Sequence, residues 1–159
     1  MNNRTVIVIT GPTASGKTTL GVSLALALGT EVVSADSMQL YRGMDIGSAK
    51  PTREEMRGVP HHMIDVAAPA EDYSVSRWVE NAAACCDALL AGGKTPVIVG
   101  GTGLYIESLL SGRDFSAAPG DSGVREALGA EYDALGGAAS YTAQIAPSFR
   151  LVNVNASLG

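Results

Sequence analysis

The sequence predicts an α/β domain in which a parallel sheet carries helices on both of its faces. Runs at 5–10 and 96–99 are typical of strands buried on both sides, and residues 31–35 predict a further strand between them. Helical spacing of apolar residues follows the first run at 17–28 and precedes the last at 74–91. Because strands that alternate with helices pair in parallel through crossover connections, this order predicts the fold class.

The first strand and the first helix are joined by a glycine-rich turn. Every residue of the run 5–10 is β-branched, and the turn occupies 11–16. In the helix expected at 17–28, which Gly29 ends, apolar residues four apart mark the face predicted to be buried: Leu20, Leu24 and Leu28. The second strand ends at Asp36.

Residues 42–60 form a long excursion from the sheet, rich in charged residues, glycine and proline. Within it, Thr52 is placed to cap one helical turn after Pro51. A short strand is expected at 62–66.

The long helix at 74–91 has an apolar stripe that we expect to be core, made by Val75, Trp78, Ala82, Cys85 and Leu89. The strand at 96–99 precedes a short apolar helix at 104–110. Beyond Gly112 a helix is expected at 124–135, and from Gly136 onward the chain loses clear periodicity.

Composition narrows the class of protein. With 159 residues, 46% of them apolar and 17% charged, the chain can form a hydrophobic core, which excludes a disordered or fibrous chain. No apolar run reaches the ~18 residues of a membrane span, and the N-terminus lacks a secretory signal. We therefore expect a cytoplasmic monomer with no membrane partner.

The net charge of −5 gives no global basic surface. The adjacent Cys85 and Cys86 predict neither a disulfide nor a zinc site.

A phosphate-binding motif lies in the first turn. The residues Gly11-Pro12-Thr13-Ala14-Ser15-Gly16-Lys17-Thr18 match G-x-x-x-x-G-K-[ST], between a strand and a helix. Backbone N–H groups of such a loop surround an anion, the helix N-terminus adds partial positive charge, and Lys17 adds a full charge. The Thr18 hydroxyl can bind Mg²⁺. The motif predicts a P-loop NTPase-like sheet that binds a diphosphate or triphosphate.

The strand at 96–99 ends in Gly100-Gly101-Thr102, without the aspartate that ATPases and GTPases use to hold Mg²⁺. This argues against a switch or motor ATPase. Small-molecule kinases and other phosphate-handling transferases remain.

Two further loops follow strands at the same edge of the sheet. Asp36 is either a general base facing the phosphate site or a cap for its own turn. The loop of Thr102 either faces the same crevice or is a simple strand-to-helix turn. His61 and His62 are interpreted as packing residues, and the excursion cations as a solvated surface: Arg42, Lys50, Arg53 and Arg57.

Five segments, taken in order, resemble the motifs of the bacterial tRNA dimethylallyltransferase family. They are residues 11–18, 34–41, 45–51, 61–65 and 99–105. The resemblance continues more weakly through Arg125 to Gly137.

The resemblance implies transfer of a dimethylallyl group from dimethylallyl diphosphate to N6 of an adenosine beside the tRNA anticodon. It implies that residues Gly11 to Thr18 hold the diphosphate, with Mg²⁺ at Thr18. The implied catalytic residues are Asp36, Lys17 and Thr102. The implied contacts to the tRNA anticodon arm come from Asp36, Ser37, Met38, Gln39, Thr102 and Arg125.

Family members are longer than this chain, because a helical insertion embraces the anticodon arm before the core is completed. We therefore expect a truncated chain with a P-loop core at 1–112, the start of the insertion at 113–137 and an atypical tail at 138–159. Two other activities stay open, an ATP-dependent small-molecule kinase and an adenylate isopentenyltransferase.

Overall fold

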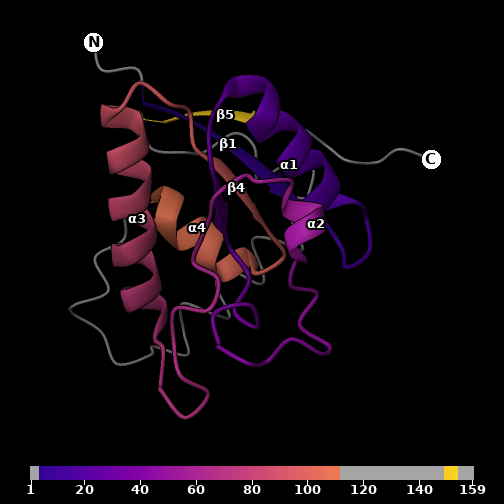
Figure 1. Ribbon diagram of the computed structural model, residues 1–159. Coiled ribbons are helices and arrows are strands. Elements are labelled where there is room, and N and C mark those ends of the chain that lie inside the picture. Colours follow the sequence, from indigo (N-terminus) through magenta and orange to yellow (C-terminus); the bar gives the residue numbers. More distant parts are fainter. Residues whose placement is uncertain (1–3, 112–148, 154–159) are drawn as a thin grey trace, which may run out of the picture.

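A parallel sheet runs through the centre of the computed structural model, which describes residues 4–111 and 149–153 (Figure 1). Within these residues the sheet has five strands in the order β3-β2-β4-β1-β5, and every neighbouring pair is parallel. The strands are β1 (Arg4–Thr10), β2 (Val32–Ser34), β3 (His61–His62), β4 (Val97–Gly100) and β5 (Phe149–Asn153).

Helices cover both faces of this sheet. They are α1 (Lys17–Leu28), α2 (Arg53–Met56), α3 (Val75–Ala91) and α4 (Gly103–Ser111). Alternate residues of β1 face opposite layers: Ile7 and Ile9 pack with α1, whereas Val6 and Val8 join the core under α3 and α4. The predicted α/β fold class is therefore confirmed.

The buried face of α1 matches only part of the leucine stripe that the spacing predicted, because Leu20 and Leu24 are partly buried and pack against the core. Gly21, Val22 and Ala25 are the buried residues of α1, whereas Leu28 is 48% exposed. Gly21 explains the difference, because a Cβ there would lie 2.5 Å from Cγ2 of Val99. The absence of a side chain lets α1 lie close to the sheet, so that small residues face it. In α3, Cys86 is buried more fully than the predicted Cys85.

Strand β3 is shorter than the strand that the sequence predicted at 62–66. Only His61–His62 form a strand, because Met63 and Asp65 adopt left-handed backbone angles, with φ of 66° and 55°. The cap at Thr52 is confirmed: its hydroxyl accepts from the Glu55 N–H, and the Glu55 carboxylate accepts from the Thr52 N–H at 2.7 Å.

Strand β5 lies in a segment for which the sequence predicted no element. Phe149–Asn153 pairs in parallel along residues 4–8 of β1. Pairing through main-chain groups requires no side-chain periodicity, which explains why the pattern did not reveal it. The helix expected at 124–135 and most of the predicted insertion and tail lie outside the described residues.

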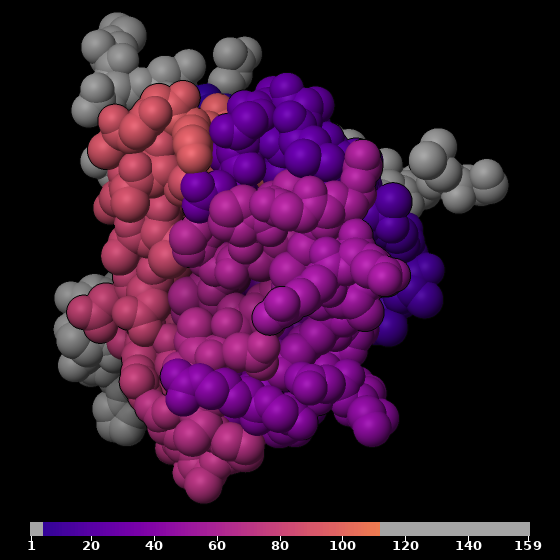
Figure 2. Space-filling model, in the orientation of Figure 1, coloured from indigo at the N-terminus to yellow at the C-terminus, as the bar shows by residue number. Residues whose placement is uncertain are grey.

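The segment between β2 and α3 covers much of the face that Figure 2 presents, flanked by α1 and α3. None of the helices in residues 4–111 is both long and apolar enough to cross a membrane.

The approach of β4 to β2 generates a testable prediction. A Cβ at Gly100 would lie 2.2 Å from the carbonyl oxygen of Ala35, so Gly100→Ala requires the backbone to move. We expect a loss of about 3 kcal/mol in the free energy of unfolding. Urea unfolding measures it, with Gly103→Ala as the matched control because nothing lies within 4 Å of a Cβ there. Equal stability of the two variants would contradict the close contact.

Candidate functional site

The loop between β1 and α1 has the geometry of an anion cradle. Gly16 adopts φ 84° and Ala14 φ 60°, which turns the chain sharply before the helix. The N-cap of α1 is Gly16, which has no side chain to satisfy the first amides of the helix. Lys17 donates from Nζ to the carbonyl oxygen of Pro12 at 2.6 Å, across the loop. Unsatisfied amides and an adjacent ammonium are the groups that hold phosphates.

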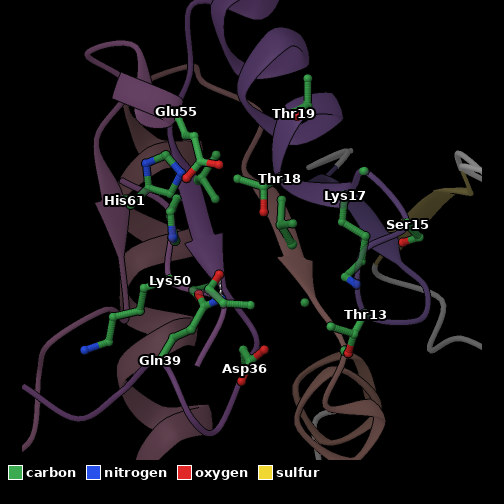
Figure 3. A pocket seen from close by; sticks show the side chains of 18 of the residues that line it. Thr13, Ser15, Lys17, Thr18, Thr19, Asp36, Gln39, Lys50, Glu55 and His61 are labelled. Carbon is green, nitrogen blue, oxygen red and sulfur yellow. Dashed lines mark hydrogen bonds between the residues drawn. The ribbon is translucent and has the colours of Figure 1, made fainter. Parts of the chain in front are cut away.

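A cavity of about 350 Å³ lies between this loop and the excursion. In Figure 3 the loop residues line one side, Gln39, Glu55 and His61 line the other, and Asp36 lies near the base. The loop side comprises Thr13, Ala14, Ser15, Gly16, Lys17, Thr18 and Thr19. The remaining lining residues are Val32, Ser34, Asp36, Gln39, Ala49, Lys50, Pro51, Glu55, His61, Val99, Gly100 and Gly101.

Asp36 lines this cavity and also caps its own turn. Its Oδ1 accepts from the backbone N–H of Met38 at 2.9 Å, and its carbonyl oxygen accepts from the N–H of Gln39. The capping interpretation is therefore confirmed. The same hydrogen bond fixes the carboxylate beside the cavity, so the role of general base stays a prediction that this geometry allows.

Thr102 contacts the turn of Asp36 rather than the cavity. Its Oγ1 accepts from the N–H of Ser37 at 3.0 Å, and its N–H donates to the carbonyl oxygen of Ala35 at 3.1 Å. Thr102 is absent from the residues that line the cavity. Its contacts are those of a residue that fixes the position of the Asp36 turn.

Gln39 has both ends of its side-chain amide engaged. Its Oε1 accepts from the Ser34 hydroxyl at 2.8 Å, and its Nε2 donates to the carbonyl oxygen of Ala49 at 3.0 Å. Of the other predicted nucleotide contacts, Met38 is 46% exposed and Ser37 is partly buried. Arg125 lies outside the described residues.

Sequence reasoning missed one side of the cavity. Lys50 was interpreted as a solvated cation, yet its side chain is only 7% exposed. Glu55 and His61 also line the cavity, a position that the sequence did not predict for them. The segment 45–51, one of the five that carry the family resemblance, was the available signal, since its residues 49–51 line the cavity opposite the loop.

The two histidines differ in environment. Nδ1 of His61 lies 2.8 Å from the carbonyl oxygen of Val59, which requires that nitrogen to carry the proton. Burial lowers the pKa of His61, so its neutral form is favoured beside the cavity. His62 instead pairs with Glu31 at 2.6 Å, as the packing interpretation expected. Hydrogen bonds from Lys94 and His62 lower the pKa of Glu31.

The chain matches family models and curated relatives along most of its length. The IPP transferase model matches residues 39–148, and the isopentenyl transferase model matches residues 4–69. The first match extends past Gly137, where the resemblance in the sequence ended.

The relatives described here share the name tRNA dimethylallyltransferase. The chain is 51% identical over 123 residues to the tRNA dimethylallyltransferase of Pelotomaculum thermopropionicum, covering 77% of this chain and 39% of the relative. The corresponding protein of Geobacillus kaustophilus is 53% identical, with the same shares covered. The chain thus spans about two fifths of the length of these relatives.

A solved structure of a similarly named enzyme also matches this chain. The full-length tRNA isopentenylpyrophosphate transferase of Bacillus halodurans matches with a TM-score of 0.71 and 43% identity, over 84% of this chain and 44% of that protein.

The cradle yields a second prediction. Lys17→Ala is expected to weaken binding of inorganic diphosphate with Mg²⁺ about 100-fold, because a charge-assisted contact is lost. Calorimetry measures the affinity. Lys94→Ala is the control, since Lys94 pairs with Glu31 and does not line the cavity. Equal affinity in a folded Lys17→Ala protein would remove Lys17 from the site.

Proposed function

Because this chain belongs to the IPP transferase family, we propose that it forms the diphosphate-binding core of a tRNA dimethylallyltransferase. The proposed reaction moves a dimethylallyl group from dimethylallyl diphosphate to N6 of an adenosine beside the anticodon. One observation carries the proposal: a single cavity has a phosphate cradle on one side and the Asp36 carboxylate near its base (Figure 3).

The cradle suits the leaving group. Backbone N–H groups of residues 13–16, the first amides of α1 and the Lys17 ammonium would neutralise the diphosphate as it departs. The Lys17 contact to Pro12 would be exchanged for one to the diphosphate. Such preorganised donors lower the barrier because charge on the leaving oxygen grows in the transition state.

Mg²⁺ fits this site with Thr18 as its protein ligand. The Thr18 hydroxyl is an oxygen ligand that lines the cavity. Among residues 4–111 and 149–153, no cluster of three His, Cys, Asp or Glu side chains could hold a metal ion. Mg²⁺ commonly takes few protein ligands together with substrate phosphates and water, and when bound it would neutralise diphosphate charge.

The acceptor side is built around Asp36. An exocyclic adenine amine is a weak nucleophile, because its lone pair is delocalised into the ring. In the proposed step the N6–carbon bond forms, the carbon–oxygen bond to diphosphate breaks, and the N6 proton passes to the Asp36 carboxylate. The Met38 N–H and the Thr102–Ser37 contact hold this carboxylate and its turn in place.

The target nucleotide would lie along the turn that carries the base. Ser37, Met38 and Gln39 follow Asp36, and Arg125 is the further proposed contact to the anticodon arm. Thr102 would act by positioning this turn. An unpaired anticodon-loop base can be moved out of its stack at low cost, which makes such an acceptor accessible.

The experiment is a single-turnover assay with dimethylallyl diphosphate, Mg²⁺ and an anticodon stem-loop RNA. Mass spectrometry of the digested RNA is expected to show dimethylallyl adenosine. A parallel reaction with ATP distinguishes a kinase: transfer of the terminal phosphate, with no prenylated RNA, would contradict the proposal.

Asp36→Asn gives the third prediction. Transfer to N6 should fall about 100-fold, the usual effect of losing a general base, while the affinity for Mg²⁺–diphosphate stays within about twofold. Asp72→Asn is the control, because the exposed Asp72 lies outside the cavity lining. A variant with a lower melting temperature but a normal transfer rate would leave Asp36 only its capping role.

A further inference from the structure

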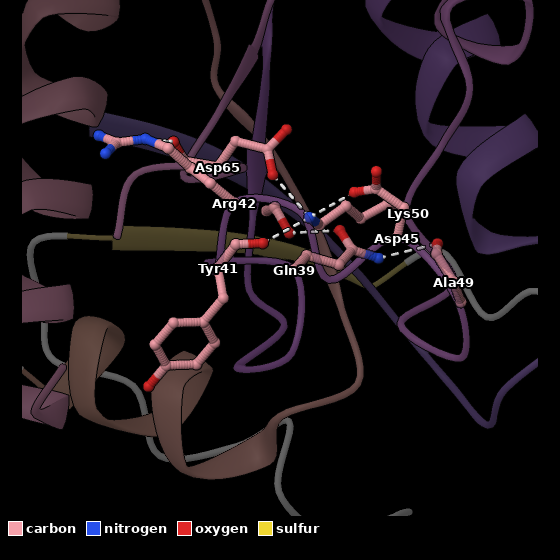
Figure 4. A network of polar contacts seen from close by, with 8 residues as sticks. Gln39, Tyr41, Arg42, Asp45, Ala49, Lys50 and Asp65 are labelled. Atoms are coloured by element: carbon pink, nitrogen blue, oxygen red, sulfur yellow. Dashed lines mark hydrogen bonds and ion pairs between the residues drawn. The ribbon is translucent and has the colours of Figure 1, made fainter. Parts of the chain in front are cut away.

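The ammonium group of Lys50 joins three separate parts of the chain (Figure 4). Nζ donates to the carbonyl oxygen of Tyr41 at 2.5 Å, to Oδ1 of Asp65 at 2.6 Å and to Oδ1 of Asp45 at 2.9 Å. These three bonds use all the donors that an ammonium group has. In Figure 3 the same group points away from the cavity, so Lys50 contributes its stem to the lining and its charge to this network.

The backbone around this network is held in unfavourable conformations. Ala49 has φ 52°, Asp65 φ 55° and Met63 φ 66°, although none of them is glycine. Such residues persist only where their surroundings define them strongly, and they cluster at functional sites. Two of the three are direct neighbours or partners of Lys50.

A continuous series of contacts leads from Lys50 to Asp36 through Gln39. The Gln39 side chain donates to the carbonyl oxygen of Ala49, the residue before Lys50. The Gln39 carbonyl oxygen accepts from the N–H of Asp65, the Lys50 partner, at 3.1 Å. The Gln39 N–H in turn donates to the carbonyl oxygen of Asp36 at 3.2 Å.

We propose that Lys50 is a positioning residue for the proposed transfer. It fixes Ala49 and Asp65, these fix Gln39, and Gln39 fixes the turn that directs the Asp36 carboxylate into the cavity. The inference rests on the proposed function for its catalytic consequence, but the structural coupling can be tested without turnover.

Stability alone accounts poorly for a buried lysine here. Its partners Asp45 and Asp65 are 71% and 50% exposed, so water would solvate both carboxylates without it. An ion pair with an exposed carboxylate contributes little to stability, whereas a buried charge can specify one arrangement of the groups around it. Burial opposes the charge of Lys50, but the hydrogen bonds that it donates to Asp65 and Asp45 outweigh burial and raise the pKa of Lys50, so the network persists at neutral pH.

The fourth prediction concerns Lys50→Met, which keeps the stem and removes the charge. The Met38 amide reports on Asp36 directly, because it donates to Asp36 Oδ1. We expect its hydrogen exchange, followed by NMR, to be about tenfold faster in the variant, together with that of Asp65. Amides of α1 and the affinity for Mg²⁺–diphosphate should not change. Lys94→Met is the matched control, since that surface lysine pairs with Glu31.

A merely structural role gives a different result. Faster exchange at Asp65 with no change at Met38, or a lower melting temperature alone, would overturn the proposal. Asp65→Asn serves as a second variant that keeps Lys50 and weakens one bond, and a Met38 amide unaffected in it would also count against the proposal.

Transfer kinetics distinguish the two proposals. In a chain that transfers the dimethylallyl group, Lys50→Met should lower kcat about tenfold with KM for the diphosphate unchanged. In a Gln39→Leu background the same change should have a smaller further effect, because that substitution removes the side-chain bond from Gln39 to Ala49 and leaves only the main-chain route through Asp65. If Lys50→Met shows the Met38 effect but the wild-type protein transfers no dimethylallyl group, the proposed function alone is refuted. Transfer with independent effects of the two substitutions would refute the Lys50 inference alone.

Discussion

The carboxyl ends of β2 and β4 approach so closely that no side chain fits between Gly100 and the carbonyl oxygen of Ala35. The rest of the site depends on this contact. It lets the N–H of Thr102 reach Ala35 and the Thr102 hydroxyl reach Ser37, so the loop after β4 holds the turn after β2. The carboxylate at the start of that turn is thereby placed beside the same cavity as the loop after β1.

The cavity separates two kinds of chemistry that would interfere if they touched. Lys17 and the uncapped start of α1 favour negative charge on one side. Asp36 is itself negative and would repel a diphosphate in direct contact. The sheet resolves this conflict because β4 lies between β1 and β2, which sets the two turns apart across one strand.

Two lysines border the cavity and serve it in different ways. Among residues 4–111 and 149–153, the Lys17 ammonium donates to one backbone carbonyl, that of Pro12, and it stands next to the anion cradle. The Lys50 ammonium has three partners and faces away from the cavity, where it stabilises the shape of the opposite wall. A cation with all its donors engaged cannot also hold a ligand, so the partners of each lysine decide its role.

The sequence by itself determined the strand–helix order, the turn at 11–18 and the cap at Thr52, because each depends on neighbouring residues and local backbone preferences. The second strand, predicted to run to Asp36, ends at Ser34. Tertiary structure alone decided that Gly21, Val22 and Ala25 rather than Leu28 are buried in α1, that Lys50 is buried, and that 149–153 pairs with β1. Those outcomes depend on contacts between segments distant in the chain. Val99 limits how closely α1 approaches the sheet, three acceptors surround the Lys50 ammonium, and β5 pairs with β1 through main-chain groups. None of these contacts leaves a periodic pattern in the sequence.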